Sequence, residues 1–271
     1  MDNSEIGKYI DVDGIKTNYH DCGSGDPVLL LHGSGPGVSA WVNWRLYMPE
    51  ISIRVHVIAP DIVGFGFTQR PENIQYSMDI WVKYIISFLD ALEIEKVSIV
   101  GNSFGGALAL AMAIKHPKKV DKLILMGSVG IKFKLTEGLD KVWGYTPSIN
   151  SMRELLDLFA YDRSLVTDEL SELRYKASIR KGFQESFSSM FPAPRQRWID
   201  AMSQSEEKVA LIKHPTLIIH GREDQIIPKE NSIQLFNMIN DAELHMFGQC
   251  GHWTQIENRD VFNRLVIDFL L

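Results

Sequence analysis

The sequence has few cysteines and no long apolar run. Its two cysteines, Cys22 and Cys250, allow neither a disulfide framework nor a zinc-ligand spacing. Residues 1–5 lack the basic start and the apolar core of a signal peptide. The longest apolar run, residues 107–114, is far too short to span a bilayer. We therefore expect a cytoplasmic protein with no membrane partner and no metal site.

Charge of one sign is not concentrated anywhere either. The net charge is −6 and no block of like charges is present, which argues against a nucleic-acid partner and a charged interaction tail. The composition is that of a globular domain, with 45% hydrophobic and 23% charged residues. A length of 271 residues suits one large α/β domain, or one domain that carries an insertion.

The central motif is Gly101-Asn102-Ser103-Phe104-Gly105. The preceding Val-Ser-Ile-Val at 97–100 is typical of a buried strand, and the Ala/Leu-rich run at 106–114 favours a helix. A G-x-S-x-G pattern between a strand and a helix predicts a nucleophile elbow, in which the serine adopts a strained backbone conformation. The helix start then offers N–H groups to an anion beside Ser103. The alternative is a glycine-rich connector with an incidental serine.

Strand-like and helical segments alternate along most of the chain. Strands are expected at 8–12, 15–20, 27–31, 55–60, 97–100, 122–126, 216–220 and 243–247, with helices at about 77–92, 106–114 and 229–239 and at the C-terminus. This alternation predicts an α/β fold with a mostly parallel sheet covered by helices on both faces. Between 130 and 205 the patterns are helical only. We therefore expect a core of residues 1–129 and 206–271, with an inserted helical cap at 130–205.

A serine becomes a nucleophile only when a neighbouring base takes its proton. Of the eight histidines, His252 is the best candidate, because it follows the loop Gly248-Gln249-Cys250-Gly251 between the last strand and the last helix. Loops after parallel strands are where α/β sheets place catalytic groups. His220, by contrast, lies within a strand pattern and is expected to be structural.

The third member should be a carboxylate that orients the imidazole. Asp224 follows the strand at 216–220, and the adjacent Glu223 is its rival. The order Ser103, Asp224, His252 is that of an α/β-hydrolase.

An oxyanion hole needs two backbone N–H donors. Phe104, the residue after the nucleophile, supplies one. The glycine-rich loop after the strand at 27–31 supplies the other, for which we select Ser34. His32 in that loop is expected to be a structural hydrogen-bonding residue.

Four motifs together resemble the meta-cleavage product hydrolases, which are α/β-hydrolases of aromatic degradation that hydrolyse carbon–carbon bonds. They are His32-Gly33-Ser34-Gly35-Pro36-Gly37, Gly101-Asn102-Ser103-Phe104-Gly105-Gly106, Gly221-Arg222-Glu223-Asp224 and Gly251-His252-Trp253. The similarity covers nearly the whole chain, cap included. It is closest to the branch that acts on ring-fission products of monocyclic aromatics.

The resemblance implies a role for each matching residue. Ser103, Asp224 and His252 form the triad, with Ser34 and Phe104 as oxyanion donors. A polar subsite contains Asn43 and Asn102, Arg174 holds the substrate carboxylate, and Trp253 packs against the dienoate. The pocket for the C6 substituent is assigned to Val129, Leu139, Trp143, Ile199, Ile226 and Ile227, and is expected to be small. The residues themselves leave open a rim arginine at 174 and ordinary core packing for the apolar set.

The implied substrate is a 2-hydroxy-6-oxo-hexa-2,4-dienoate, cleaved at C5–C6 without metal or organic cofactor. The sequence leaves open whether serine or water attacks C6, and what the oligomeric state is, a homodimer included. Two other functions also stay open. One is a carboxylesterase or lactonase on the same scaffold, for which Arg174 would have nothing to bind, and the other is a ligand receptor that retains the triad.

Overall fold

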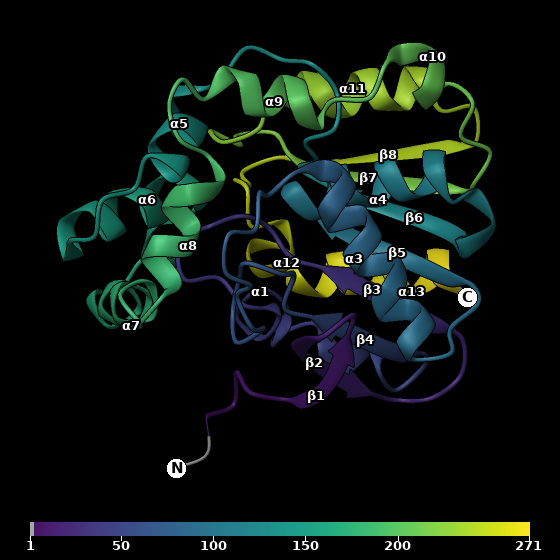
Figure 1. Ribbon diagram of the computed structural model, residues 1–271. Coiled ribbons are helices and arrows are strands. Elements are labelled where there is room, and N and C mark those ends of the chain that lie inside the picture. The colour runs from purple at the N-terminus through teal and green to yellow at the C-terminus, as the bar shows by residue number, and fades with distance from the viewer. Residues whose placement is uncertain (1–2) are drawn as a thin grey trace.

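The computed structural model describes residues 3–271, so Met1 and Asp2 of the predicted core lie outside it. One eight-stranded sheet has the order β1-β2-β4-β3-β5-β6-β7-β8 (Figure 1). Strands β3 to β8 pair in parallel, whereas β2 is antiparallel to both β1 and β4. The predicted mostly parallel sheet is confirmed. The strands are β1 (Lys8–Val12), β2 (Ile15–Cys22), β3 (Pro27–Leu31), β4 (His56–Pro60), β5 (Val97–Asn102), β6 (Val120–Met126), β7 (Thr216–Gly221) and β8 (Ala242–Phe247).

The helices follow from local signals where they are long. Helix α3 starts after Ser77, whose hydroxyl accepts the N–H of Ile80, as the cap pattern predicts. The helices are α1 (Ala40–Trp44), α2 (Met48–Ile51), α3 (Met78–Ala91), α4 (Phe104–Lys115), α5 (Glu137–Trp143), α6 (Ile149–Phe159), α7 (Asp168–Ser178), α8 (Phe183–Met190), α9 (Gln196–Met202), α10 (Glu206–Val209), α11 (Lys229–Met238), α12 (Thr254–Glu257) and α13 (Arg259–Leu270), with 3-10 turns η1 (Pro117–Lys119) and η2 (Arg163–Leu165).

Side chains of the central strands alternate between two buried faces. In β3, Leu29 and Leu31 pack into the apolar cluster that includes α3, α4 and α11, whereas Val28 and Leu30 pack into the cluster of α1, α2 and α13. Both faces of the sheet are therefore covered by helices, which fixes the sheet as a rigid support for the loops at its edge.

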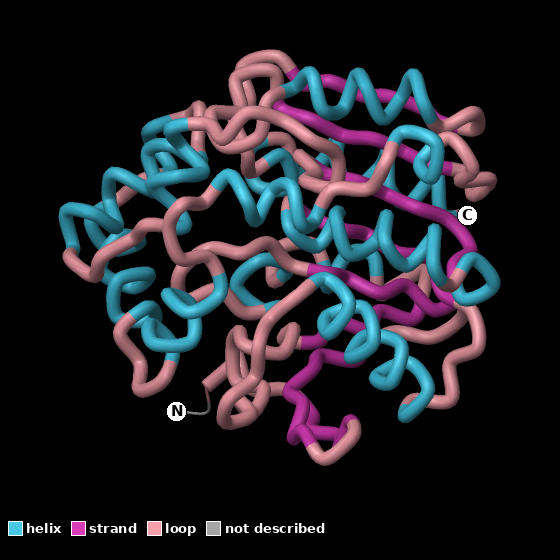
Figure 2. Tube along the Cα trace, turned by 45° about the horizontal axis from the view of Figure 1, so that its top comes forward, coloured by secondary structure: helices cyan, strands magenta, loops and turns pink. Residues whose placement is uncertain are grey.

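The segment between β6 and β7 is helical. It contains α5 to α9 and, just before β7, α10, and the described residues include no strand there. Figures 1 and 2 place α5 to α8 together on one side of the sheet. The exact division into core and cap at 129/130 and 205/206 stays a prediction.

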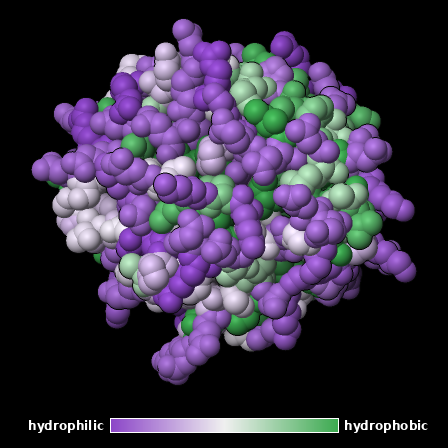
Figure 3. Space-filling model, turned by 90° about the horizontal axis from the view of Figure 1, so that it is seen from above, coloured by the Kyte–Doolittle hydropathy of each residue, from purple (hydrophilic) through white to green (hydrophobic). Residues whose placement is uncertain are grey.

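The surface and the helix lengths fit a globular domain. Hydrophilic residues cover most of the face in Figure 3, with hydrophobic residues between them. Within residues 3–271, no helix has the length and apolar character that crossing a membrane requires.

Candidate active site

The elbow at Ser103 has the strained geometry that the motif predicts. Between β5 and α4, Ser103 has φ 55° and ψ −111°, which non-glycine residues rarely adopt. A Cβ added to Gly105 would lie 2.2 Å from the Leu31 carbonyl oxygen, and one at Gly106 2.2 Å from Ser128 Oγ. The two glycines therefore allow strand and helix to approach closely enough to present the serine at the sheet edge.

Asp224 orients His252. The Nδ1 atom of His252 lies 2.6 Å from Asp224 Oδ2, and both side chains are almost fully buried. The other oxygen, Oδ1, accepts the backbone N–H groups of Ile226 and Ile227 at 2.7 and 3.0 Å. Burial alone would raise the pKa of the Asp224 carboxyl, but His252 and His220 beside it hold that pKa well below its usual range. Asp224 is thus anionic and keeps His252 in one orientation.

The rival carboxylate points elsewhere. Glu223 Oε1 pairs with Arg222 at 2.7 Å, and Oε2 accepts the N–H of Cys250 at 3.0 Å. The geometry therefore favours Asp224 as the partner of His252. Cys250 itself is buried, and burial raises the pKa of its thiol to about 12, so no thiolate is available near His252.

Ser103 and His252 line one cavity of about 270 Å³. Ser103 lines this cavity, and its hydroxyl has no hydrogen-bond partner among residues 3–271. Catalytic hydrogen bonds are often loose without substrate. The backbone N–H groups of Ser34 and Phe104 likewise donate to no other part of the described chain. Ser34, Ser103 and His252 line the cavity and Phe104 directly follows Ser103, while the oxyanion roles of Ser34 and Phe104 stay predictions.

The polar part of the cavity is formed by two amides and an arginine. Asn43 Oδ1 accepts from Gly33 N at 3.2 Å and from Asn102 Nδ2 at 3.0 Å. This leaves Asn43 Nδ2 and Asn102 Oδ1 buried without partners in the described chain. Arg174 on α7 donates from Nη2 to the Pro36 carbonyl at 3.1 Å, while Nη1 is buried and unpaired among the described residues.

The charge of Arg174 is retained despite this burial. Burial lowers the pKa of its guanidinium to about 10, which is still well above neutral pH. A buried cation with a free N–H group is costly unless an anion reaches it. The cavity therefore suits a ligand that carries a carboxylate.

An aromatic pair closes another side of the cavity. Trp253 stacks on Phe159 with ring centroids 5.4 Å apart and planes at 4°, and both residues line the cavity. The Phe159 carbonyl also accepts the N–H of His252 at 2.8 Å. These flat faces suit a planar conjugated ligand.

The six residues assigned to the C6 pocket are placed differently from one another. All six are buried, but only Leu139 and Ile226 line the cavity, whereas Val129, Trp143, Ile199 and Ile227 do not. Trp143 donates from Nε1 to Ser34 Oγ at 3.0 Å, which ties helix α5 to the predicted oxyanion loop.

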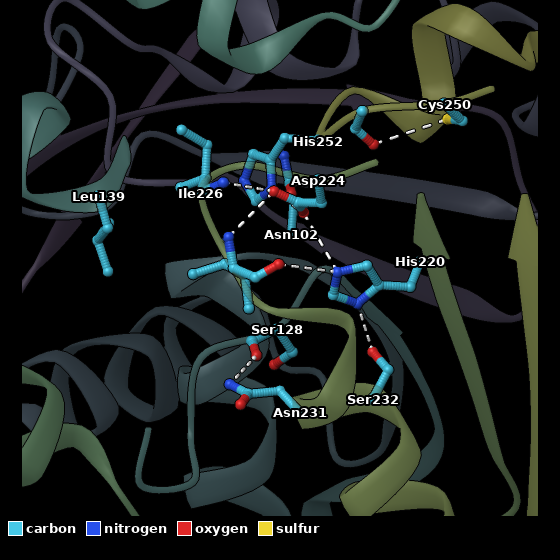
Figure 4. Close-up of polar contacts among 12 residues, drawn as sticks. Asn102, Ser128, Leu139, His220, Asp224, Ile226, Asn231, Ser232, Cys250 and His252 are labelled. Carbon is cyan, nitrogen blue, oxygen red and sulfur yellow. Dashed lines mark hydrogen bonds and ion pairs between the residues drawn. The ribbon is translucent and has the colours of Figure 1, made fainter. Parts of the chain in front are cut away.

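Sequence reasoning missed several residues at the site. Besides Phe159, the cavity is lined by Val38, Val42, Arg45, Leu46, Val142, Met152, Leu155, Leu156, Leu165, Leu170, Gln255 and Ile256. His220, expected to be merely structural, has Nε2 3.3 Å from Asp224 Oδ2 (Figure 4). The signal that could have indicated this contact is the position of His220, at the end of a strand and four residues before Asp224.

Comparison with known proteins gives a consistent result. The family of the alpha/beta hydrolase fold matches residues 26–259. The chain is 60% identical over 268 residues to 2-hydroxy-6-oxo-2,4-heptadienoate hydrolase of Pseudomonas putida strain F1, covering 99% of this chain and 97% of that protein. It is 59% identical over 266 residues to 2-hydroxymuconate semialdehyde hydrolase of Pseudomonas sp. strain CF600, covering 98% and 94%.

A solved structure is equally similar. The S103A mutant of the meta-cleavage product hydrolase CumD from Pseudomonas fluorescens IP01, complexed with acetates, has a TM-score of 0.98 and 63% identity, covering 99% of this chain and 98% of that one. These matches extend over nearly the full length of each protein and confirm the resemblance drawn from the motifs. The chain therefore belongs to the alpha/beta hydrolase fold family and, within it, to the meta-cleavage product hydrolases.

Proposed function

We propose that this site hydrolyses the C5–C6 bond of 2-hydroxy-6-oxo-hexa-2,4-dienoates to 2-hydroxypenta-2,4-dienoate and a small carboxylic acid. The observation that carries the proposal is the unpaired Nη1 of buried Arg174 in the same cavity as Ser103 and the His252–Asp224 pair. The names of the two similar relatives, both hydrolases of such dienoates or semialdehydes, support it. In the cell the substrate is a small ring-fission product, and we place the enzyme in the cytoplasm.

Binding begins with the carboxylate and the conjugated chain. Arg174 Nη1 donates to the carboxylate, which satisfies a buried donor and an anion together. The free amide atoms of Asn43 and Asn102 bind the neighbouring 2-hydroxy end, and Trp253 packs on the diene. Helices of the 130–205 segment, through Arg174 and Leu139, cover the substrate and exclude water.

The first chemical step prepares the bond for cleavage. The 2-hydroxydienoate becomes its keto form when a proton is added at C5 and the hydroxyl proton is removed, and His252 is placed to shuttle these protons. The C5–C6 bond can then break, because the departing electron pair flows into a conjugated enolate.

The second step is attack at C6. The attacking oxygen belongs to Ser103 or to a water molecule, and His252 accepts its proton while Asp224 stabilises the imidazolium. The N–H groups of Ser34 and Phe104 hold the oxyanion that forms on the former C6 carbonyl. Collapse of this intermediate expels the dienolate, which takes the proton from the His252 imidazolium. If water attacked, the C6 carbon leaves directly as the carboxylic acid. If Ser103 attacked, the C6 carbon stays as an ester on Ser103, and a water molecule that gives its proton to His252 then hydrolyses the ester to the acid.

The test is turnover of 2-hydroxymuconate semialdehyde by the purified protein. We expect loss of its yellow colour, with formate and 2-hydroxypenta-2,4-dienoate formed in equal amounts. Persistent colour together with hydrolysis of p-nitrophenyl acetate would instead identify a carboxylesterase. If neither substrate were turned over while the dienol bound, the protein would be a receptor.

A further inference from the structure

His220 and Ser232 lie directly behind the Asp224 carboxylate. His220 is at the end of β7, and Ser232 is in the first half of α11. Both residues are fully buried. Figure 4 shows His220 between Ser232 and Asp224. Ser232 Oγ lies 2.6 Å from His220 Nδ1, and His220 Nε2 lies 3.1 Å from the Ile227 carbonyl and 3.3 Å from Asp224 Oδ2.

These contacts fix which ring nitrogen of His220 carries the proton. A carbonyl oxygen only accepts, so the 3.1 Å contact with Ile227 requires a proton on Nε2. Nδ1 then accepts, and the Ser232 hydroxyl donates to it. If Nδ1 were protonated as well, the Ser232 hydroxyl proton would have no acceptor among residues 3–271. The contacts are therefore all satisfied by a neutral ring with hydrogen on Nε2.

We propose that Ser232 and His220 act as positioning residues for the reaction. Ser232 fixes the tautomer of His220, and the Nε2–H group of His220 donates to the Ile227 carbonyl while lying 3.3 Å from the oxygen of Asp224 that also receives His252. The inference rests on the proposed function only in taking His252 as the base. Asp224 Oδ1 is anchored by two backbone N–H groups, and Oδ2 lies between His252 Nδ1 at 2.6 Å and His220 Nε2 at 3.3 Å. His220 therefore limits rotation of the carboxylate and shares its negative charge.

Sharing that charge has a defined consequence for catalysis. A carboxylate that lies beside a second N–H group stabilises an adjacent imidazolium less. His220 thus takes part of the negative charge of Asp224 away from His252. Without His220, the acidic limb of the pH–rate profile should move to higher pH by about half to one unit.

The other titratable groups near His220 and Asp224 contact other residues. Glu223 pairs with Arg222, and the Cys250 thiol, whose pKa burial raises to about 12, is neutral. On α12, Glu257 accepts the N–H of Gly251. The remaining candidates on the packed elements are Lys229 and Glu230, which open α11, and Glu243 and His245 on β8, where His245 packs on Phe247. Asp224 lies in direct contact with His220, and His252 in turn contacts Asp224.

The experiment compares pH profiles of kcat/KM for His220→Met, His220→Gln and wild type. Methionine fills the space without a donor, whereas the glutamine amide can again donate toward Asp224. We expect His220→Met to shift the acidic limb upward by half to one pH unit and to lower kcat severalfold at little cost in KM. His220→Gln should restore the wild-type limb. His245→Met, on the adjacent strand, is the matched control and should leave the profile unchanged.

Profiles are recorded with both the dienoate and p-nitrophenyl acetate, because His252 serves both. If the dienoate were not cleaved, the proposed substrate would be wrong, while the ester profile would still decide the role of His220. An unshifted limb in a folded His220→Met protein, or equal shifts in the Met and Gln variants, would overturn the inference.

A spectroscopic readout covers the case in which His220→Met does not fold. In wild-type protein, ¹⁵N ring shifts should report hydrogen on Nε2 of His220, and Ser232→Ala should alter the Nδ1 signal. A neutral ring with its hydrogen on Nδ1 would contradict the assignment.

Discussion

Replacing Arg174 by lysine or alanine should impair cleavage of the dienoate far more than hydrolysis of a neutral ester. In the structure Nη2 is committed to the Pro36 carbonyl, so Nη1 is the group left for the substrate carboxylate. Hydrogen bonds to charged groups are worth about 1.5–3 kcal/mol. Their loss should lower kcat/KM for the dienoate roughly ten- to a hundred-fold. Lysine carries the charge but cannot bond the loop carbonyl and a carboxylate with one planar fork, so it should behave as a non-conservative change.

The assay measures kcat/KM for 2-hydroxymuconate semialdehyde and for p-nitrophenyl acetate with each variant. The ester has no carboxylate, so its hydrolysis should barely change. Lys176→Ala is the matched control, because Lys176 lies on the same helix but pairs with Glu172 at the surface. Equal losses on both substrates would indicate a folding defect rather than a lost contact. Unchanged dienoate turnover in Arg174→Ala would refute the assignment of the carboxylate site.

Three further outcomes are expected. Substrates with hydrogen or methyl at C6 should have a higher kcat/KM than the 6-phenyl analogue, since one misfitting methylene costs ~1–3 kcal/mol in an apolar pocket. Leu139→Ala should reduce this difference in kcat/KM between the small substrates and the phenyl substrate. A wild-type preference for phenyl would contradict a small pocket. Burial lowers the pKa of His32 to about 4, whereas an unfolded histidine titrates near 6.5, so the unfolded chain takes up the proton first. The free energy of unfolding should therefore fall by about 3 kcal/mol as pH drops from 6.5 toward 4. Urea unfolding measures this free energy for wild type and for His32→Gln, and the difference between the two proteins at each pH gives the contribution of His32. Gly105→Ala should give little folded protein, because its Cβ would meet the Leu31 carbonyl at 2.2 Å; a wild-type melting temperature would argue against the tight elbow.

The elbow and the alternation of strands and helices could be predicted because their signals are local. A strand, three glycines around Ser103 and an Ala/Leu-rich helix follow one another directly, and the strained φ is a consequence of that order. Short helices such as α1, α2 and α10, of four or five residues, could not be predicted, because they are too short for a helical period to show.

The choice between Asp224 and Glu223 needed the structure. The two carboxylates are adjacent in sequence and follow the same strand, so local pattern treats them alike. Only the approach of the loop after β8 brings His252 to Asp224 and leaves Glu223 with Arg222. His220 was missed for the same reason: within a strand pattern, a buried histidine looks like any other core residue.

Cavity walls were the least predictable part. Leu139 and Val129 are both buried and apolar, yet only Leu139 lines the cavity. An apolar side chain that faces a cavity and one that faces the core have the same sequence signature, because both are excluded from bulk water. The lining by Phe159 depends likewise on how α6 packs against the loop that carries His252.

Breakage of a carbon–carbon bond by Ser103 and the His252–Asp224 pair is tested most directly by a single turnover of the 6-methyl dienoate. Wild type and Ser103→Ala are compared, with acetate quantified over time. We expect rapid acetate formation by wild type and a rate lower by thousands-fold or more in the mutant. The mutant should still fold and bind the dienol, and it should retain ketonisation if His252 alone drives that step. Acetate formation by Ser103→Ala at close to the wild-type rate would show that Ser103 is not needed to break the bond.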